Sequence, residues 1–564
     1  MLALASAGTA QEDMSIHGVD GQIEENIRAH VKLAGESCSL PAWRVQQYRR
    51  DLPQQVQDAV RAYGYYNTEI KQRFEQNEKC WKLDLDVTLG PRVRYRKINV
   101  STDRAPASLV PELEALISHP ALKSGQSLKH GEYESYKGTL LDTARRFGYW
   151  EAKYTQSELA IYPKDDAADV ALKLEIGPRY RIGEQRYPDL ELRETFLRRL
   201  AGDISGEPYS EMALQDVYKR FQGTDYFRKV IITPRFEQAD DEHRVPLDFD
   251  LSLAPHHSFG TGIGYSTDQG ARLRGNYTNR YLNDLGHHWR TDALLAERVR
   301  ELLGTYIIPK HNAAKEWYEL SAGYLEEEYE AYQSNTLSTS ARSIYSFNDG
   351  WVVNAGVNLR EETYQEQQET KFRKTLIVPG VGATWIHASE EPRQTSGYRF
   401  ETGITFSHEM WASEVNFVQA YSRVKGIFSP IERGRFIARA EIAGTLMDDI
   451  NELPPSVRFY TGGDNSVRGY GYNTIGIEKE NGEITGGGKL IVGSIEYDHL
   501  ILKSWSLSTF YDIGDAFNEN PNYRKAWGVG VRWYSPVGPL RLDFAFPENS
   551  ADDFRIHVSV GADL

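Results

Sequence analysis

The sequence lacks any long apolar run. Its 564 residues contain no stretch of about 18 consecutive apolar residues, and the mean hydropathy is −0.56 with 26% charged residues. A helix that crosses a membrane needs about 20 mostly apolar residues, so a bundle of transmembrane helices is excluded. A transmembrane β-barrel is not excluded, because its strands alternate polar and apolar side chains and leave no hydropathy peak.

Basic residues are also fewer than acidic residues. The chain carries 65 Lys and Arg against 80 Asp and Glu, which gives a formal net charge of −15. A protein that holds nucleic acid needs a basic surface to neutralise the phosphates. The composition therefore predicts no nucleic-acid partner.

Motifs for catalysis and for metal binding are absent or weak. The chain contains no Gly-x-Ser-x-Gly and no His-Glu-x-x-His, and the glycines at 260, 262 and 264 do not precede a predicted helix, as a dinucleotide site requires. The histidine pairs at 256–257 and 287–288 point to opposite faces of a strand, which does not suit a metal ion. We expect no enzymatic activity, no catalytic residue, no metal site and no cofactor.

The N-terminus indicates export. Residues 1–10 are rich in small and apolar side chains, like the end of a secretory signal peptide, although the basic segment that normally comes first is missing. The chain contains only two cysteines, Cys38 and Cys80, which an exported protein can join in a disulfide. Cys80 lies on the polar side of an alternating segment, so the sequence leaves the bridge open.

The first part of the chain contains an internal repeat with an aromatic signature. The signature reads AYGYY at 62–66, RFGYW at 146–150 and TDYF at 224–227. Two helical patterns precede each copy, and a strand followed by a strictly alternating strand comes after it. In the first alternating strand Leu83, Leu85 and Val87 share one face, which predicts a core on one side and water on the other.

Prolines at the strand ends divide this region into three modules, 11–91, 92–178 and 179–255. Each has the order strand, helix, helix, strand, strand, which predicts a small α+β unit whose sheet is covered by helices on one side. The uncovered edge strand can accept an extended peptide through main-chain hydrogen bonds. A peptide-binding array and a set of spacers that orient the following domain both remain open.

After Pro255 the helical periodicity disappears, and residues 256–564 read as alternating strands. Leu540 and Leu542, for example, alternate with Arg541 and Asp543. In a soluble β-sandwich these charges would be exposed or unpaired, whereas in a membrane barrel they face a wet lumen and the apolar set faces lipid. The 34 Tyr, 11 Trp and 47 Gly also suit a barrel with aromatic girdles. We therefore predict a transmembrane antiparallel β-barrel after the modules.

One connection of the predicted barrel is unusually long. Residues 448–488 separate two alternating segments, whereas most connections have about 2 to 6 residues. The connection contains RFYTGGDNSVRGY at 458–470, in which Gly469 permits backbone conformations closed to other residues. Arg468 carries five donors on a planar fork, and it needs an acidic partner if it leaves bulk water.

The chain has three such modules ahead of a barrel, and a long late connection contains Val467, Arg468, Gly469 and Tyr470. This organisation resembles the outer-membrane assembly and transport superfamily, whose repeats are called POTRA domains. The resemblance covers nearly the whole chain. It implies sixteen barrel strands in the outer membrane of a Gram-negative bacterium, with residues 11–255 in the periplasm. It also implies that the loop 448–488 folds into the lumen, where its Arg pairs with acidic residues on the following strands.

The segments that match those acidic strands contain Glu496 and Asp512. Ile495 and Tyr497 share the lipid face of the first strand, so Glu496 points inward, and the same alternation turns Asp512 inward on the next strand. A charge-assisted pair with the loop Arg is then expected. The predicted latch consists of Val467, Arg468, Gly469 and Tyr470, with Glu496 and Asp512 as its partners. The alternative is a solvated Arg at the tip of the loop.

The resemblance further implies a lateral seam between the first and last barrel strands, through which client strands enter the membrane. The predicted first strand is weak, because three glycines on one face lower its strand propensity and its packing. An opened edge offers unpaired backbone groups where no water can satisfy them. The alternative is that these glycines leave room for the returning loop. The expected seam residues are Phe259, Gly260, Gly262, Gly264, Val558 and Gly561.

These features predict a non-enzymatic factor that helps to insert or translocate β-barrel proteins, such as autotransporters, by strand templating at the seam. The resemblance implies unfolded outer-membrane protein clients, outer-membrane lipid and a periplasm-spanning partner that docks on the first module. A two-partner secretion transporter, which exports one dedicated exoprotein, shares the barrel and loop but typically has two repeats and a plug helix. A passive channel is the third class, and three modules with a latched loop argue against it.

Overall fold

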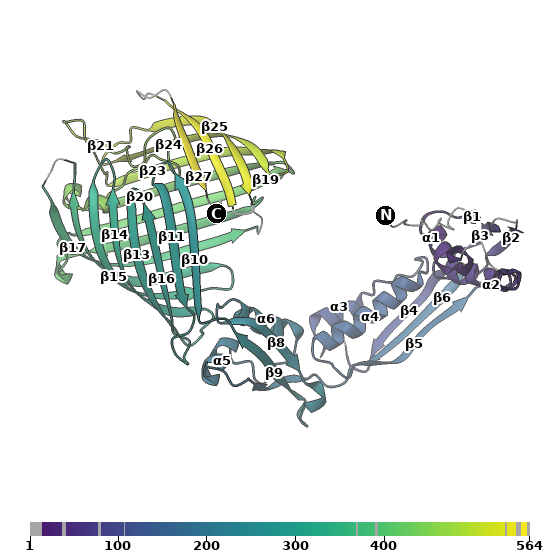
Figure 1. Cartoon of the computed structure of the whole chain (residues 1–564). Helices are drawn as coiled ribbons and strands as arrows, with labels where there is room; N and C mark the ends of the chain where they lie inside the picture. Colours follow the sequence, from purple (N-terminus) through teal and green to yellow (C-terminus); the bar gives the residue numbers. More distant parts are fainter. Residues whose placement is uncertain are drawn as a thin grey trace, which may run out of the picture. The chain divides into compact units, whose positions relative to one another are not determined.

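The computed structural model describes residues 14–36, 41–76, 81–105, 108–367, 370–389, 393–535, 538–548 and 554–560. The chain divides into two compact units (Figure 1). One contains the first two modules and part of the third, and the other contains the rest of the third module and the barrel. The segment 1–10, both cysteines and the expected seam residue Gly561 lie outside the described residues.

Each module has the predicted order of elements. The first consists of β1 (Met14–His17), α1 (Gly21–His30), η2 (Lys32–Gly35), α2 (Ala42–Arg61), β2 (Glu69–Gln76) and β3 (Trp81–Thr88). Its sheet has the order β1-β3-β2, and β1 runs parallel to β3. Alternation along β3 buries Trp81, Leu83, Leu85 and Val87 against the helices, as the sequence predicts.

The other two modules repeat this arrangement. Their sheets have the orders β4-β6-β5 and β7-β9-β8. No helix in the described part of the chain is long and apolar enough to cross a membrane. The elements are β4 (Arg94–Thr102), α3 (Pro111–Ser118), α4 (His130–Arg146), β5 (Lys153–Tyr162) and β6 (Ala167–Glu175), then β7 (Arg181–Arg186), α5 (Glu194–Ala201), α6 (Glu211–Gln222), β8 (Phe227–Pro234), η4 (Phe236–Gln238) and β9 (Arg244–Leu253).

The aromatic signature forms the joint between one repeat and the next. Gly64 has a φ of +90°, and a Cβ on it would lie 2.5 Å from the carbonyl oxygen of Leu128 in the second module. Gly148 has a φ of +91°, and its Cβ would lie 2.8 Å from the carbonyl oxygen of Tyr209 in the third. Only glycine combines this conformation with such a close backbone approach. The third signature lacks the glycine, and its Tyr226 hydroxyl instead donates to the carbonyl of Gly286, after the first barrel hairpin, at 2.6 Å.

The barrel is closed and antiparallel, with sixteen described strands in chain order. Their bounds are β10 (His257–Ser266), β11 (Gly270–Asn279), β12 (His288–Ala296), β13 (Val299–Pro309), β14 (Glu316–Glu328), β15 (Gln333–Ser346), β16 (Trp351–Gln365), β17 (Phe372–Ala388), β18 (Gly397–Ser407), β19 (Phe417–Ile431), β20 (Gly434–Leu446), β23 (Lys489–Leu502), β24 (Trp505–Phe517), β25 (Arg524–Ser535), β26 (Gly538–Pro547) and β27 (Arg555–Val560). This confirms the predicted fold class.

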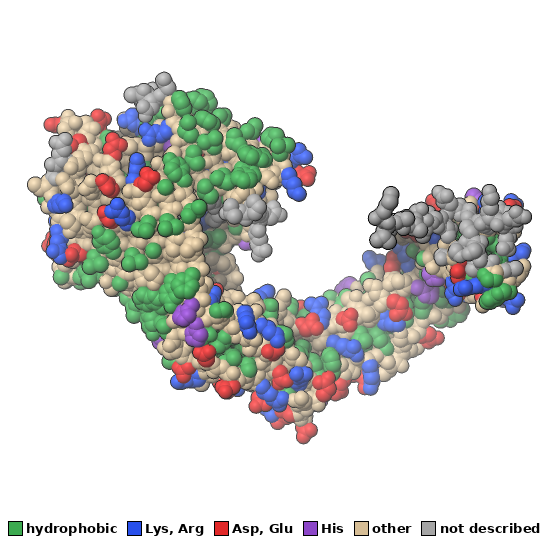
Figure 2. Space-filling view, in the orientation of Figure 1, with side chains coloured by type: hydrophobic (Ala, Val, Ile, Leu, Met, Phe, Trp, Pro, Cys, Tyr) green, Lys and Arg blue, Asp and Glu red, His purple; other side chains and the backbone are tan. Residues whose placement is uncertain are grey.

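Alternation divides each barrel strand between an apolar outer face and a polar inner face. On β23 Ile495 is 54% exposed, while its neighbour Glu496 is 9% exposed. On β24 Leu507 points outward and Asp512 is fully buried. Hydrophobic side chains gather over the outer surface of β25, β26 and β27 (Figure 2). The outer face suits lipid, and the charges lie in the lumen.

The connection between β20 and β23 contains short elements only: η6 (Ile450–Glu452), η7 (Pro455–Val457), β21 (Ile477–Glu478) and β22 (Ile484–Thr485). The short helix η5 (Glu409–Trp411) lies in another connection on the same side of the barrel. Brief turns join β19 to β20 and β23 to β24 at the opposite end, where the connection 280–287 is longer. The longest connection thus lies at one end of the barrel, as in outer-membrane barrels with long extracellular loops.

We expect the joint between the first two modules to weaken in acid. The Tyr66 hydroxyl shares a 2.5 Å hydrogen bond with His130 Nε2, and burial raises the pKa of Tyr66 to about 12 and lowers the pKa of His130 below its usual 6.5. The fold therefore favours neutral His130. Its contribution to stability is complete above about pH 6.5 and is lost as the pH falls through the lowered pKa.

Hydrogen exchange of peptides around 62–66 and 128–133, corrected for intrinsic rates, should accelerate between pH 8 and pH 5. The variant His130→Gln cannot gain the charge, so this acceleration should disappear. An equal pH dependence in both proteins would show that another group controls the joint.

Candidate functional site

The long loop 448–488 is anchored to the barrel wall next to its Arg-Gly pair. Arg439 of β20 donates through Nη2 to the carbonyl oxygen of Ser466 at 2.5 Å. Val467 is fully buried in an apolar cluster with Ile475, Leu490, Val492, Ala516 and Ala526. A Cβ on Gly514 would lie 2.9 Å from Val467 Cγ2, so the missing side chain on β24 makes room for this residue. Burial of Val467 fixes the height along the barrel wall at which Arg468 contacts the inner face.

Arg468 is held by the two carboxylates that the sequence pattern predicts. Its Nε and Nη2 donate to the two oxygens of Asp512 at 2.8 and 3.0 Å, and its Nη1 donates to Glu496 at 2.8 Å. The backbone N–H of Arg468 also donates to Asp512 at 3.1 Å. The guanidinium lies over the ring of Phe510, with its central carbon 3.4 Å from the centroid. A charge this deeply buried is stable only when it is paired and hydrogen-bonded in this way.

Two further residues belong to this network, and the sequence pattern alone does not assign them to the latch. Asp543 of β26 accepts from Arg468 Nη1 at 3.2 Å, and Arg532 of β25 donates to Glu496 at 2.8 Å and to Asp543 at 2.5 Å. Alternation along β26 already turns Asp543 inward. The stagger of the strands decides which inward-facing charges are neighbours, and alternation along a single strand does not specify this stagger.

Gly469 and Tyr470 extend the contact to the last strands. Gly469 has a φ of +94°, a conformation that favours glycine, and its N–H donates to His557 Nε2 of β27 at 2.9 Å. The Tyr470 hydroxyl donates to the carbonyl of Glu548, which follows β26, at 2.7 Å. The predicted latch therefore contacts β23, β24, β26 and β27, and its last two residues bind the end of the barrel next to the seam.

The pairing of β10 with β27 is described only as far as Val560. Among the described residues, the register between these two strands contains one pair, Ser266 opposite Ser559, whereas β10 pairs with β11 along its whole length. The expected seam residue Val558 accepts a hydrogen bond through its carbonyl from the Thr267 N–H at 3.2 Å. Phe259, at the other end of β10, is 77% exposed on the outer face.

The glycines of β10 make room for side chains of β11 and not for the returning loop. A Cβ on Gly260 would lie 2.4 Å from Asn276 Oδ1, and a Cβ on Gly264 would lie 2.8 Å from Arg272 Nε. At Gly262 no heavy atom of the described residues lies within 4 Å of the Cβ position. The loop-clearance interpretation of these glycines is therefore wrong at 260 and 264.

Gly264 has a specific consequence for the seam. Arg272 lies opposite it on β11 and reaches past β10, where its Nη2 donates to the carbonyl oxygen of Val560 on β27 at 3.0 Å. A side chain at 264 would occupy this path. The richness of the first strand in glycine is plain from the sequence, but nothing there indicates that an Arg from the second strand holds the last one.

Comparison with known proteins identifies the family. The Omp85 superfamily domain matches residues 257–563, and the POTRA domain described as TamA domain 1 matches residues 13–89. The chain belongs to the Omp85 superfamily. The predicted resemblance is thereby confirmed, and the protein is a TamA-type member of the Omp85 superfamily in the Gram-negative outer membrane.

Two relatives agree with this assignment, and a solved structure shares the fold. The chain is 23% identical to the outer membrane protein assembly factor BamA of Nitratidesulfovibrio vulgaris over 65% of this chain and 48% of that protein. It is 22% identical to BamA of Neisseria meningitidis serogroup B over 89% of this chain and 70% of that protein. It thus spans about half the length of the first relative. The crystal structure of Haemophilus ducreyi BamA lacking POTRA domains 1–3 shares the fold, with a TM-score of 0.70 at 16% identity, covering 83% of this chain and 99% of that one.

We expect Arg468→Ala and Asp512→Ala to be strongly coupled. Removing one partner of a buried ion pair leaves the other charge unpaired and costs roughly 3 to 5 kcal/mol. The second substitution should then cost much less than it does alone. A double-mutant cycle on the unfolding of the barrel in detergent measures this difference.

Arg399 and Glu401 provide the matched control. They form a 3.3 Å pair on β18 in which both side chains are partly exposed. Their coupling should be about 0 to 1 kcal/mol. Additive effects at Arg468 and Asp512 would show that the pair does not hold the loop.

Proposed function

We propose that this protein is the outer-membrane subunit of a translocation and assembly module, in the manner of TamA. It helps to insert or translocate β-barrel proteins, including autotransporters, by templating their strands at the seam. The single register pair between β10 and β27 within the described residues is the observation that supports this function best. An edge strand with unpaired backbone groups is a template for an incoming strand, and within lipid no water competes for those groups.

The latch supports the same proposal by explaining how a weak seam stays closed. Arg468 binds the wall at β23 and β24, and Gly469 binds His557 on β27 beside the seam. The strand β27 therefore binds the long loop and also forms one side of the seam. In the proposed cycle, a client strand displaces β27 from β10 while the buried charges hold the loop in the lumen. The process is an exchange of hydrogen bonds that needs no nucleotide and no catalytic residue.

A periplasm-spanning, TamB-like partner is proposed to dock on the first POTRA module. The edges of its sheet are β1 and β2, either of which can accept a further strand. Trp43 at the start of α2 is 70% exposed, and Trp is a residue type enriched in protein interfaces. The match of residues 13–89 to the first TamA POTRA domain points to the same module.

A two-partner secretion transporter is the alternative, because it shares the barrel and the latched loop. Three POTRA modules favour the assembly factor, since the secretion group typically has two. The outer-membrane proteome of a depletion strain separates the two functions. Loss of several autotransporters supports the assembly factor, and loss of one secreted exoprotein supports the transporter.

A disulfide across the seam should abolish assembly. Ser266 and Ser559 are register partners, so cysteines at both positions have suitable spacing for a bridge. In a background with Cys38→Ser and Cys80→Ser, the oxidised double variant should fail to restore autotransporter assembly to a deletion strain. Reducing agent should restore it.

The matched control places cysteines at Ser321 and Ser340, register partners on β14 and β15 away from the seam. This pair should leave assembly intact when it is oxidised. Full activity of the locked Ser266–Ser559 variant would rule out strand exchange at the seam.

A further inference from the structure

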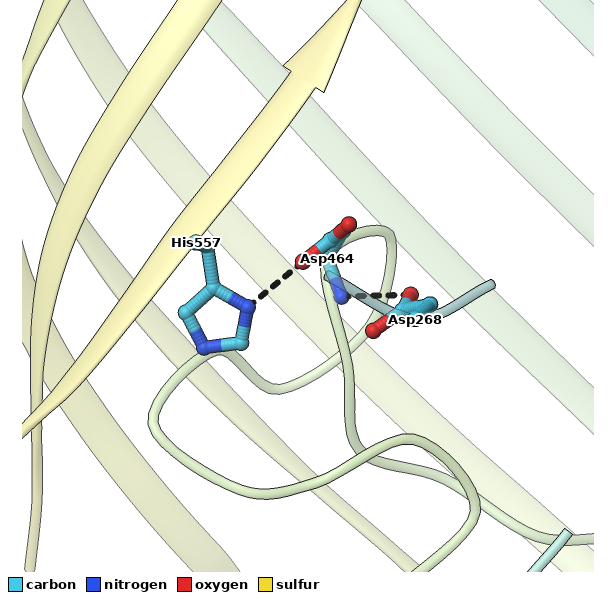
Figure 3. A group of neighbouring side chains, drawn as sticks. All are labelled: Asp268, Asp464 and His557. Carbon is cyan, nitrogen blue, oxygen red and sulfur yellow. Dashed lines mark hydrogen bonds and ion pairs between the residues drawn. The ribbon is translucent and has the colours of Figure 1, made fainter. Parts of the chain in front are cut away.

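Three ionisable side chains from distant parts of the sequence meet beside the seam (Figure 3). Asp268 lies in the turn between β10 and β11, Asp464 lies in the long loop, and His557 lies on β27. One ligand atom of each lies within 4.8 Å of the others. The first hairpin, the latch loop and the last strand therefore converge on one point.

The cluster brings two buried carboxylates close together. Asp268 is 7% exposed, and the side chains of Asp464 and His557 are each 4% exposed. His557 Nδ1 lies 2.6 Å from Asp464, and Arg298 Nη1 lies 3.5 Å from the backbone carbonyl oxygen of Asp268. Two carboxylates buried together repel one another and lose their hydration, so the site favours an added positive charge.

One carboxylate oxygen has no partner. Asp464 Oδ1 accepts hydrogen bonds from the Thr267 hydroxyl at 2.5 Å and from His557 Nδ1 at 2.6 Å. Asp464 Oδ2 is buried and has no hydrogen-bond partner among the described residues. Asp268 accepts one hydrogen bond through Oδ2, from the backbone N–H of Asp464 at 2.9 Å. The cluster thus holds buried acceptors with unused lone pairs, which costs free energy unless a ligand satisfies them.

We propose that Asp268, Asp464 and His557 bind one divalent transition-metal cation of the zinc class. Two carboxylates and one imidazole provide three ligands, and a water molecule completes a tetrahedral set. The imidazole favours zinc and related ions over calcium or magnesium, which prefer oxygen ligands throughout. The cation neutralises both carboxylates. This site is independent of the proposed assembly function, because it follows from the three side chains alone.

The hydrogen bond from Gly469 to His557 shows which contact would change when the metal site is occupied. The Gly469 N–H donates to His557 Nε2, so the ring proton of neutral His557 is on Nδ1 and faces Asp464. When Nδ1 binds the cation, this proton moves to Nε2. Nε2 then carries an N–H and can no longer accept the hydrogen bond from the Gly469 N–H. Metal binding and the Gly469 bond therefore exclude one another. Occupancy ties Asp268 to His557 across the seam and releases Gly469 from β27.

Zinc titration of the full-length protein in detergent, after treatment with a chelator, tests the site. Isothermal calorimetry should show one zinc bound per chain in the wild type. Asp268→Asn, Asp464→Asn and His557→Gln should each weaken this binding about tenfold or more. Glu191→Gln is the matched control, because Glu191 and His256 form an exposed carboxylate–imidazole pair at 2.9 Å, and it should bind zinc as the wild type does.

Hydrogen exchange of the wild type provides a readout that does not depend on the folding of a variant. Zinc should accelerate exchange in peptides that contain Gly469 and slow it in peptides that contain Thr267 and Asp268. The proposal is overturned if the wild type binds no stoichiometric zinc, if the three variants bind it as well as the wild type does, or if exchange at Gly469 is unchanged.

Discussion

The buried pairing of Arg468 with Asp512 is the interaction on which the inside of this barrel depends. A guanidinium in the lumen wall is tolerable only with its charge matched, and two fixed carboxylates beneath it set one position for the loop. Arg532 in turn balances Glu496 and Asp543, so the five groups form one network across four strands. Removal of any member leaves a charge that the others cannot compensate.

The position of the loop follows from this pairing. Val467 enters the gap above Gly514 only when its neighbour is docked, and Gly469 meets His557 only when the chain turns with a positive φ directly after Arg468. Three consecutive residues thus combine an apolar anchor, an ion pair and a backbone contact. Together they connect the interior of the barrel to its last strand, whose described part shares one register pair with the first strand.

Much of this arrangement follows from the sequence because strand alternation is a local property. A period of two places Glu496 and Asp512 on the inner face, and the repeated aromatic signature marks the three modules together with the prolines at the strand ends. Contacts between strands are not local. The roles of Asp543, Arg532 and Arg272 depend on stagger, and Asp268, Asp464 and His557 are too far apart in the chain for any spacing rule to join them. The expectation of no metal site rested on neighbouring histidines and therefore did not consider this cluster.

Under the proposed strand exchange, the path of Arg272 over Gly264 bears on which client strands the seam would accept. Its guanidinium donates a hydrogen bond to a main-chain carbonyl of the last strand, a group that every residue carries. Any strand that replaces β27 at this edge presents the same acceptor. This hydrogen bond recognises an extended backbone and does not depend on the side chains of the bound strand. In the proposed exchange, selectivity among client strands therefore comes from other surfaces.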